Sequence, residues 1–136
     1  MFREPQVVLL TEDLERAAAF YAGLGFAEVF RTPSDGAPIH VDLVLGGYRL
    51  GIATADSTRG DHGLDPVTSG QRVVVVLWCD DVPTAYADLV GRGVTPLKPP
   101  EPWLGRLLIA WVADPDGNPV QLVQDAPHEP QPHEPQ

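Results

Sequence analysis

Residues 7–26, VVLLTEDLERAAAFYAGLGF, begin with an apolar run and continue with the acidic pair Glu12-Asp13. A segment with apolar residues at helical spacing follows, and it ends in a stretch that contains two glycines. The same order returns 68 positions later in residues 75–94, VVLWCDDVPTAYADLVGRGV. Asp13 and Asp81 suit helix N-caps, because a short carboxylate accepts hydrogen bonds from the free amides of the first turn. Apolar residues recur at helical spacing after each aspartate. This internal repeat predicts two strand–helix–strand units in one chain.

Turn signals extend each unit beyond its helix. Gly23 and Gly91 fit a left-handed stop at the helix end. Gly46-Gly47 separates two apolar runs, which is typical of a hairpin because a primed turn needs positive φ. Asp114-Pro115-Asp116-Gly117-Asn118 separates two further runs about 70 residues later. Each half is therefore predicted to be β-α-β-β-β, and the fold class to be α+β.

The predicted organisation has four parts. The first module covers residues 1–54 and the second covers 71–124. Residues 55–70, rich in Asp, Gly, Ser and Thr, are interpreted as a linker. Residues 125–136 repeat Pro-His-Glu-Pro-Gln and are predicted to be disordered, since they hold no large apolar residue that could bury a core.

Composition excludes several classes of partner. The chain has 136 residues, 19 Asp plus Glu and 9 Lys plus Arg, for a formal charge of −10, which argues against nucleic acid. No run approaches the roughly 20 apolar residues of a membrane span. The charged start has no secretory pattern, so we expect a cytoplasmic protein. One cysteine, Cys79, excludes a disulfide within the chain.

Several motifs resemble the glyoxalase/bleomycin-resistance (vicinal oxygen chelate) superfamily over roughly residues 5 to 124. They are the paired β-α-β-β-β units, Asp-Leu-Glu-Arg at 13–16, Phe20-Tyr21, Gly23-Leu24-Gly25-Phe26 and, most specifically, Asp-Pro-Asp-Gly-Asn at 114–118. The resemblance implies two curled mixed sheets that form a cup, in a homodimer.

The resemblance also locates the positions where metal-dependent members hold their ion. In this chain they are Gln6, Gly51, Val74 and Gln121. Valine and glycine supply no side-chain ligand and neutral amides are weak ones, so we expect no metal and no cofactor. A shifted register that brings His40 or Asp42 into the cup is the alternative.

Alternation of side chains along the strands indicates which residues line the cup in place of metal ligands. If Gln6, Gly51, Val74 and Gln121 face it, Trp78 and Arg49 face it too. Trp103 follows a proline-rich segment and suits a stacking platform for a planar ligand, or else it seals a loop or dimer contact. Core packing is the alternative for Trp78 and Trp111. Candidate ligand-binding residues are Trp103, Trp111, Trp78, Tyr48, Asp42, His40, Gln6 and Gln121.

Within the superfamily the likeness is closest to metal-free drug-binding resistance proteins, through Gly-Gly-x-Arg-Leu at 46–50, Pro-Trp at 102–103 and the 114–118 turn. This implies sequestration of an aromatic or polycyclic molecule, with Asp42 or Glu101 as a counter-charge. The alternatives are a metal-free isomerase, cyclase or lyase that uses a carboxylate or His40 as base, a metal-dependent glyoxalase or dioxygenase, and an interaction module.

Overall fold

A computed structural model describes residues 1, 3–70 and 72–126. The chain divides into two compact units. The first contains Met1–Arg72 together with the turn Pro115–Gly117, and the second contains Val73–Asp114 and the chain from Asn118 onward. Residues 127–136, the main part of the predicted tail, lie outside the described residues.

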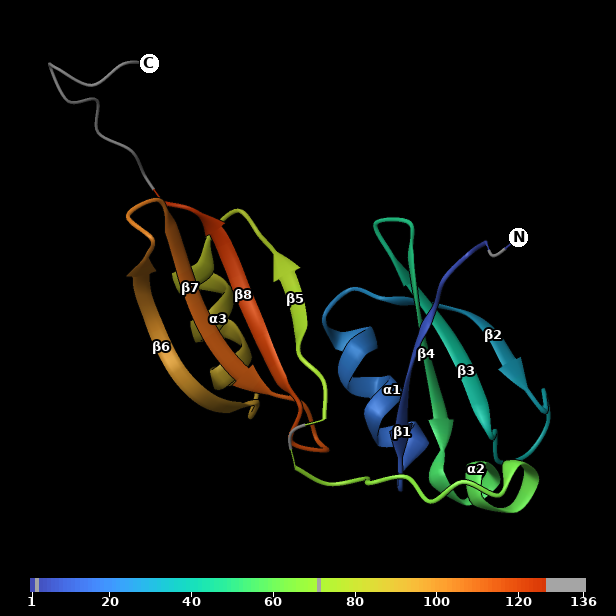
Figure 1. Ribbon diagram of the computed structural model, residues 1–136. Helices are drawn as coiled ribbons and strands as arrows, with labels where there is room; N and C mark the ends of the chain where they lie inside the picture. Colours follow the sequence, from blue (N-terminus) through green and yellow to red (C-terminus); the bar gives the residue numbers. More distant parts are fainter. Residues whose placement is uncertain (2, 71, 127–136) are drawn as a thin grey trace, which may run out of the picture. The chain divides into compact units, whose positions relative to one another are not determined.

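The first unit is a four-stranded sheet with two helices (Figure 1). Its sheet order is β1-β4-β3-β2, in which β1 runs parallel to β4 and the other neighbours are antiparallel. The elements are β1 (Val7–Thr11), α1 (Leu14–Gly23), β2 (Ala27–Thr32), β3 (His40–Leu45), β4 (Tyr48–Thr54) and α2 (Ala55–His62).

The second unit repeats this topology. Its sheet order is β5-β8-β7-β6, with β5 parallel to β8. The elements are β5 (Val75–Trp78), α3 (Val82–Gly91), β6 (Thr95–Trp103), β7 (Leu107–Ala113) and β8 (Pro119–Asp125). Two matching mixed sheets confirm the predicted α+β class with two β-α-β-β-β repeats.

The predicted helix starts are confirmed, whereas the predicted left-handed stops are displaced by two residues. Asp13 accepts a hydrogen bond from the amide of Arg16, and Asp81 accepts one from the amide of Thr84. Gly23 and Gly91 are the last helical residues, and positive φ occurs at Gly25 and Gly93. At each helix end the backbone makes a hydrogen bond that spans five residues. The amide of Phe26 donates to the carbonyl oxygen of Tyr21, and the amide of Val94 donates to that of Leu89.

The core of each unit lies between its helix and one face of its sheet. In the first unit Tyr21 is fully buried among residues of β3 and β4 such as Val41 and Ile52. In the second unit Val82 of α3 is buried together with Val112 and with other residues of β7 and β8. The helices thus cover one face of each sheet, and the opposite face carries the candidate site residues other than Tyr48.

Two segments differ from the prediction. The stretch assigned to the linker begins with α2, which Thr54 caps by accepting from Ser57 N at 3.2 Å. Ala55 and Thr58 are the buried residues of α2. Most of its other residues are polar, so the sequence shows no hydrophobic periodicity that would predict a helix here. The proline-rich segment before Trp103, for which the sequence predicted no strand bounds, belongs to the edge strand β6, where prolines can be accommodated because one side of the strand has no ladder to complete.

The two predicted hairpin turns form by different chemistry. Gly46 and Gly47 both have positive φ, at 57° and 80°. In the second unit Asp114 accepts hydrogen bonds from the amide and the side chain of Asn118, each at 2.8 Å.

Among the described residues, no helix is both long and apolar enough to cross a membrane.

Candidate functional site

A buried carboxylate lies at the centre of a polar cluster on the first sheet. Asp42 of β3 is only 6% exposed. Its Oδ1 accepts hydrogen bonds from Gln6 Nε2 at 2.6 Å and His40 Nε2 at 2.8 Å, and its Oδ2 accepts one from Arg49 Nη1 at 3.0 Å. The structure therefore brings together three of the candidate residues, Gln6, His40 and Asp42, and adds Arg49. We call these four residues the Asp42 cluster.

Strand register explains why these side chains meet. Asp42 lies opposite Gly51 in the β3–β4 pair, and Gly51 lies opposite Val8 in the parallel β1–β4 pair. Paired residues share a face of the sheet. A Cβ on Gly51 would lie 2.7 Å from Gln6 Nε2 and 2.9 Å from Val8 Cγ2. The glycine therefore leaves the space that the amide of Gln6 uses to reach Asp42.

The cluster keeps its carboxylate ionised. Burial by itself would raise the pKa of Asp42, but hydrogen bonds from His40 and Gln6, the charge of His40 and the hydrogen bond from Arg49 together hold that pKa below its usual range. An ionised Asp42 and the guanidinium of Arg49 form an ion pair at 3.0 Å. The prediction placed Arg49 on this face by alternation but gave it no role, because its partner lies on another strand.

The second sheet carries an aromatic face. Trp78 lies opposite Val123 on β8, Trp111 lies opposite Gln121, and Trp103 lies opposite Leu107 on β7. Since Gln121 and Val123 are two apart on β8, they point to the same side. The register from β5 to β6 therefore places all three tryptophans on one face. This face is opposite the one that carries buried Val120 and Leu122.

An apolar floor accompanies the tryptophans. Leu107, Ile109 and Val123 form a buried hydrophobic cluster on the same face. Trp78 is 64% exposed and Trp103 is 48% exposed, so these indoles have apolar surface left to cover. We call the three tryptophans with this floor the tryptophan face. Gln121 is half-buried beside Trp111 on β8.

Two candidate residues lie elsewhere or are already paired. Tyr48 lies at the start of β4 opposite Leu45, and it alternates away from the face that holds Arg49 and Gly51. It is half-exposed and does not join the Asp42 cluster. Glu101 of β6 lies beside the tryptophan face opposite Ile109, where it makes an ion pair with Lys98 at 2.9 Å.

The residues at the family's metal positions do not fit a divalent ion. In the first unit Gln6 turns its amide nitrogen, a donor, toward Asp42, and Gly51 offers no side chain. In the second unit the two positions carry Val74 and Gln121. His40 and Asp42 do share the face of Gln6, but among the described residues no three His, Cys, Asp or Glu side chains are grouped as a metal site.

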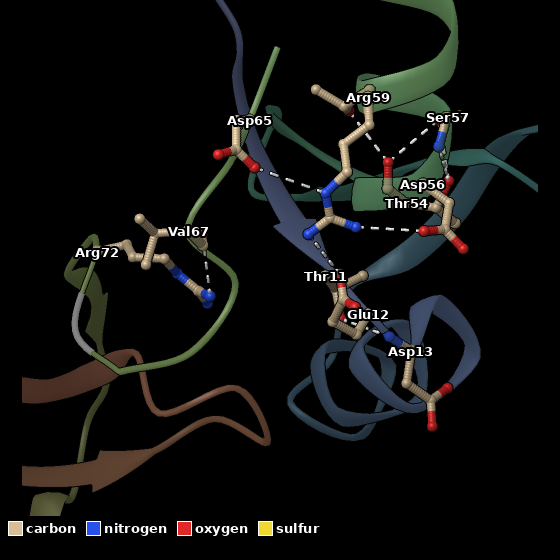
Figure 2. A network of polar contacts seen from close by, with 11 residues as sticks. Thr11, Glu12, Asp13, Thr54, Asp56, Ser57, Arg59, Asp65, Val67 and Arg72 are labelled. Carbon is tan, nitrogen blue, oxygen red and sulfur yellow. Dashed lines mark hydrogen bonds and ion pairs between the residues drawn. The ribbon is translucent and has the colours of Figure 1, made fainter. Parts of the chain in front are cut away.

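A separate hollow of about 450 Å³ lies beside α2 in the first unit. Its wall combines hydroxyl groups, acids and apolar side chains: Thr11, Glu12, Ala37, Pro38, Ile39, Thr54, Asp56, Ser57 and Asp61. Figure 2 shows Arg59 reaching from α2 to Glu12, Asp56 and Asp65, with N···O distances of 3.3, 3.2 and 3.9 Å. Arg59 thus balances the negative charge of Glu12 and Asp56, two acids that line the hollow. These ion pairs connect α2 to the end of β1.

Known proteins share this fold. A structure from Sphaerobacter thermophilus, described as a member of the glyoxalase/bleomycin resistance protein/dioxygenase superfamily, has 30% identity and a TM-score of 0.70, covering 91% of this chain and 98% of its own. A structure from Nocardioides, described as a glyoxalase/bleomycin resistance protein/dioxygenase, has 23% identity and a TM-score of 0.74, covering 100% of this chain and 93% of its own. Lactoylglutathione lyase from Agrobacterium tumefaciens has 21% identity and a TM-score of 0.66, covering 90% and 92%.

No curated protein sequence gives a significant match. The family model for the Glyoxalase/Bleomycin resistance protein/Dioxygenase superfamily matches residues 4–122, which includes both repeats. With the two matching sheets and the shared topology of the solved structures, this match identifies the family. The chain belongs to the Glyoxalase/Bleomycin resistance protein/Dioxygenase superfamily.

Proposed function

We propose that this protein, as a cytoplasmic homodimer, binds an aromatic or polycyclic small molecule without a metal ion and sequesters it unchanged. The observation that carries the proposal is the tryptophan face. Three indoles from β5, β6 and β7 lie on one side of a single sheet over the buried floor of Leu107, Ile109 and Val123. A rigid aromatic surface of this kind suits a planar ligand.

The physical gain comes from covering the indoles. Trp78 and Trp103 are 64% and 48% exposed, and burial of apolar surface is worth about 25 cal/mol per Å². Offset or edge contacts between aromatic rings add about 0.5–1.5 kcal/mol for each pair. Tryptophan loses little side-chain freedom on binding, so most of this energy remains available for affinity.

A thermal-shift screen tests the proposal, with mitomycin C and bleomycin, antibiotics that carry a planar ring system, as the first probes. A ligand at about 100 times its Kd adds roughly 2.7 kcal/mol of stability to the native state. We expect at least one such compound to raise Tm and to quench tryptophan fluorescence. Recovery of the compound unmodified after incubation is expected for sequestration, and steady turnover would contradict it.

Variants locate the binding site. Trp103→Ala and Trp111→Ala should each weaken binding about tenfold, which corresponds to a loss of about 1.4 kcal/mol. Leu64→Ala is the matched control, because Leu64 is an exposed apolar residue that follows α2 in the first unit. Unchanged affinity in both tryptophan variants would remove the tryptophan face from the site. Stoichiometric Fe, Ni or Zn in the purified protein would overturn the metal-free part of the proposal.

A further inference from the structure

The turn between β6 and β7 holds a leucine in a backbone conformation that leucine disfavours. Leu104 and Gly105 are its central residues, with φ values of 58° and 68°. The amide of Arg106 closes the turn by donating to the carbonyl oxygen of Trp103 at 3.4 Å. A positive φ brings the Cβ of an L-residue too close to a carbonyl oxygen, so glycine and asparagine are the usual residues there. Leu104 therefore carries backbone strain.

The turn between β3 and β4 has positive φ at both central residues too, but it is built from glycine. Gly46 and Gly47 have φ values of 57° and 80°, so Gly46 and Leu104 have nearly the same φ. Turns of this kind favour Asn-Gly and Gly-Gly pairs, because neither residue then suffers from the positive φ. The first unit thus makes its turn without the strain that the second unit accepts.

Leu104 is also mostly exposed, so burial within the chain does not offset the strain. Its side chain is 59% exposed, and Trp103 directly before it is 48% exposed. Trp103 lies on the tryptophan face opposite Leu107. Leu104 therefore adds exposed apolar surface at the end of β6, next to the tryptophan face. A strained residue that gains little from the fold itself indicates a role in function.

We infer that Leu104 is a specificity-determining residue, which covers one edge of the aromatic ligand bound on the tryptophan face. The inference rests on the proposed function. A ligand that stacks on Trp103 reaches the end of β6, where Leu104 supplies apolar contact area that glycine or asparagine would not supply. The contact thus explains why leucine occupies a turn position that asparagine would fit with less strain.

The position of the turn also narrows the class of ligand. Trp111 lies four residues along β7 from Leu107, the residue opposite Trp103. Four residues of a strand span about 13 Å, so a molecule that touches both Trp111 and Leu104 must be at least that long. A single ring is too short for this. The ligand is therefore a molecule with several fused or linked rings.

Leu104→Asn separates strain from recognition. Asparagine tolerates a positive φ, so the Asn-Gly turn should be less strained and Tm should rise by about 3–5 °C. The affinity for mitomycin C or bleomycin, measured by quenching of tryptophan fluorescence, should fall about fivefold because an apolar contact is lost. A purely structural role for Leu104 predicts the rise in Tm without the loss of affinity.

Three further variants isolate the two effects. Leu104→Met keeps an apolar side chain at the same φ, so it should retain both the Tm and the affinity of the wild type. Gly46→Leu is the matched control for strain, because a Cβ there would meet no atom within 4 Å. It should lower Tm by about 3–5 °C without changing the affinity. Leu64→Asn removes a leucine that is 61% exposed in the first unit, and it should change neither quantity.

The outcomes distinguish this inference from the proposed function. Equal affinity of Leu104→Asn and of a wild type that binds a probe would overturn the inference alone. A wild type that binds neither compound would overturn it together with the proposed function. An unchanged or lower Tm of Leu104→Asn would show that Leu104 is not strained. A change from dimer to monomer in ligand-free Leu104→Asn, measured by sedimentation, would make the turn a contact between two copies and would also overturn the inference.

Discussion

Asp42 and Trp111 occupy equivalent positions in the two units, yet their surroundings are opposite in chemistry. Asp42 lies opposite Gly51 of β4, which lies opposite a residue of the parallel strand β1. Trp111 lies opposite Gln121 of β8, which lies opposite a residue of the parallel strand β5. At this position the first sheet places a buried carboxylate with three partners, and the second places an indole beside an apolar floor.

The comparison shows how one scaffold supports two kinds of surface. In the first unit the absence of a side chain at Gly51 lets Gln6 reach Asp42, so the polar atoms are paired within the sheet. In the second unit the large side chains leave apolar surface exposed. The face of the first sheet therefore presents polar groups that are already paired, and that of the second presents apolar surface. The register is shared, and the residue types at equivalent positions decide the difference.

The largest expected effect comes from filling the space above Gly51. Gly51→Val places methyl groups where a Cβ alone would already be 2.7 Å from Gln6 Nε2 and 3.2 Å from Asp42 Oδ1. Overpacking of this kind costs about 3 kcal/mol at the upper end of its usual range. Urea unfolding should show a loss of that size. The expelled Gln6 would also leave Asp42 with one fewer donor.

Gly60→Ala is the control for a glycine substitution in the same unit. Gly60 lies inside α2, and a Cβ there would meet no atom within 4 Å. Alanine favours helix over glycine, so this variant should be unchanged or stabilised by up to about 1 kcal/mol. Equal stability of Gly51→Val and wild type would show that the Gln6–Asp42 contact is not needed for the sheet.

A second prediction concerns the charge of Asp42. Asp42→Asn loses the ion pair with Arg49 and weakens the other contacts, which should cost about 2 kcal/mol of unfolding free energy near neutral pH. The pKa of Asp42 is lowered in the folded state, so its stabilising contribution is present above the pKa of the unfolded chain. As pH falls from 5 through about 3.9 and then through the lower folded value, the wild type should approach the variant.

The exposed Asp35 supplies the control for this charge removal. Asp35→Asn should change the unfolding free energy by no more than about 0.5 kcal/mol at any pH between 2 and 7, as is usual for a surface substitution. A difference between wild type and Asp42→Asn that stays constant down to pH 2 would show that the carboxylate does not titrate with a lowered pKa in the native protein.

Much of the fold could be predicted because the repeat supplies the same evidence twice. The N-cap aspartates, the glycine turn at 46–47 and the turn at 114–118 each act through local chemistry, which a sequence displays. Helix α2 was missed because two small buried residues hold it and its other positions are polar. Strand β6 is one of the strands predicted for the second β-α-β-β-β unit, but its extent could not be predicted, because four prolines normally argue against a strand and only its place at the sheet edge makes them tolerable.

The candidate site could be predicted less completely, since alternation gives a face but not a partner. It placed Gln6, Arg49 and Gly51 on one side, and the pairing of β3 with β4 was needed to bring Asp42 beside them. The role of Gly51 could not be predicted, because the space beside a glycine matters only through the side chains that fill it, and the sequence does not identify those side chains. For the tryptophans, the register across all four strands was needed to show that Trp78, Trp103 and Trp111 share a face.

The smallest expected effect distinguishes a binding surface from a folding core. Trp78→Gln should cost only about 1 kcal/mol in urea unfolding, because the indole is 64% exposed on the edge strand β5. Leu122→Ala is the matched comparison: Leu122 lies on the neighbouring strand β8, is 3% exposed and faces α3, so it should cost 2–5 kcal/mol. If the two losses were equal, Trp78 would be part of the stabilising core, and the apolar surface available to a ligand on the second sheet would be reduced to Trp103 and Trp111.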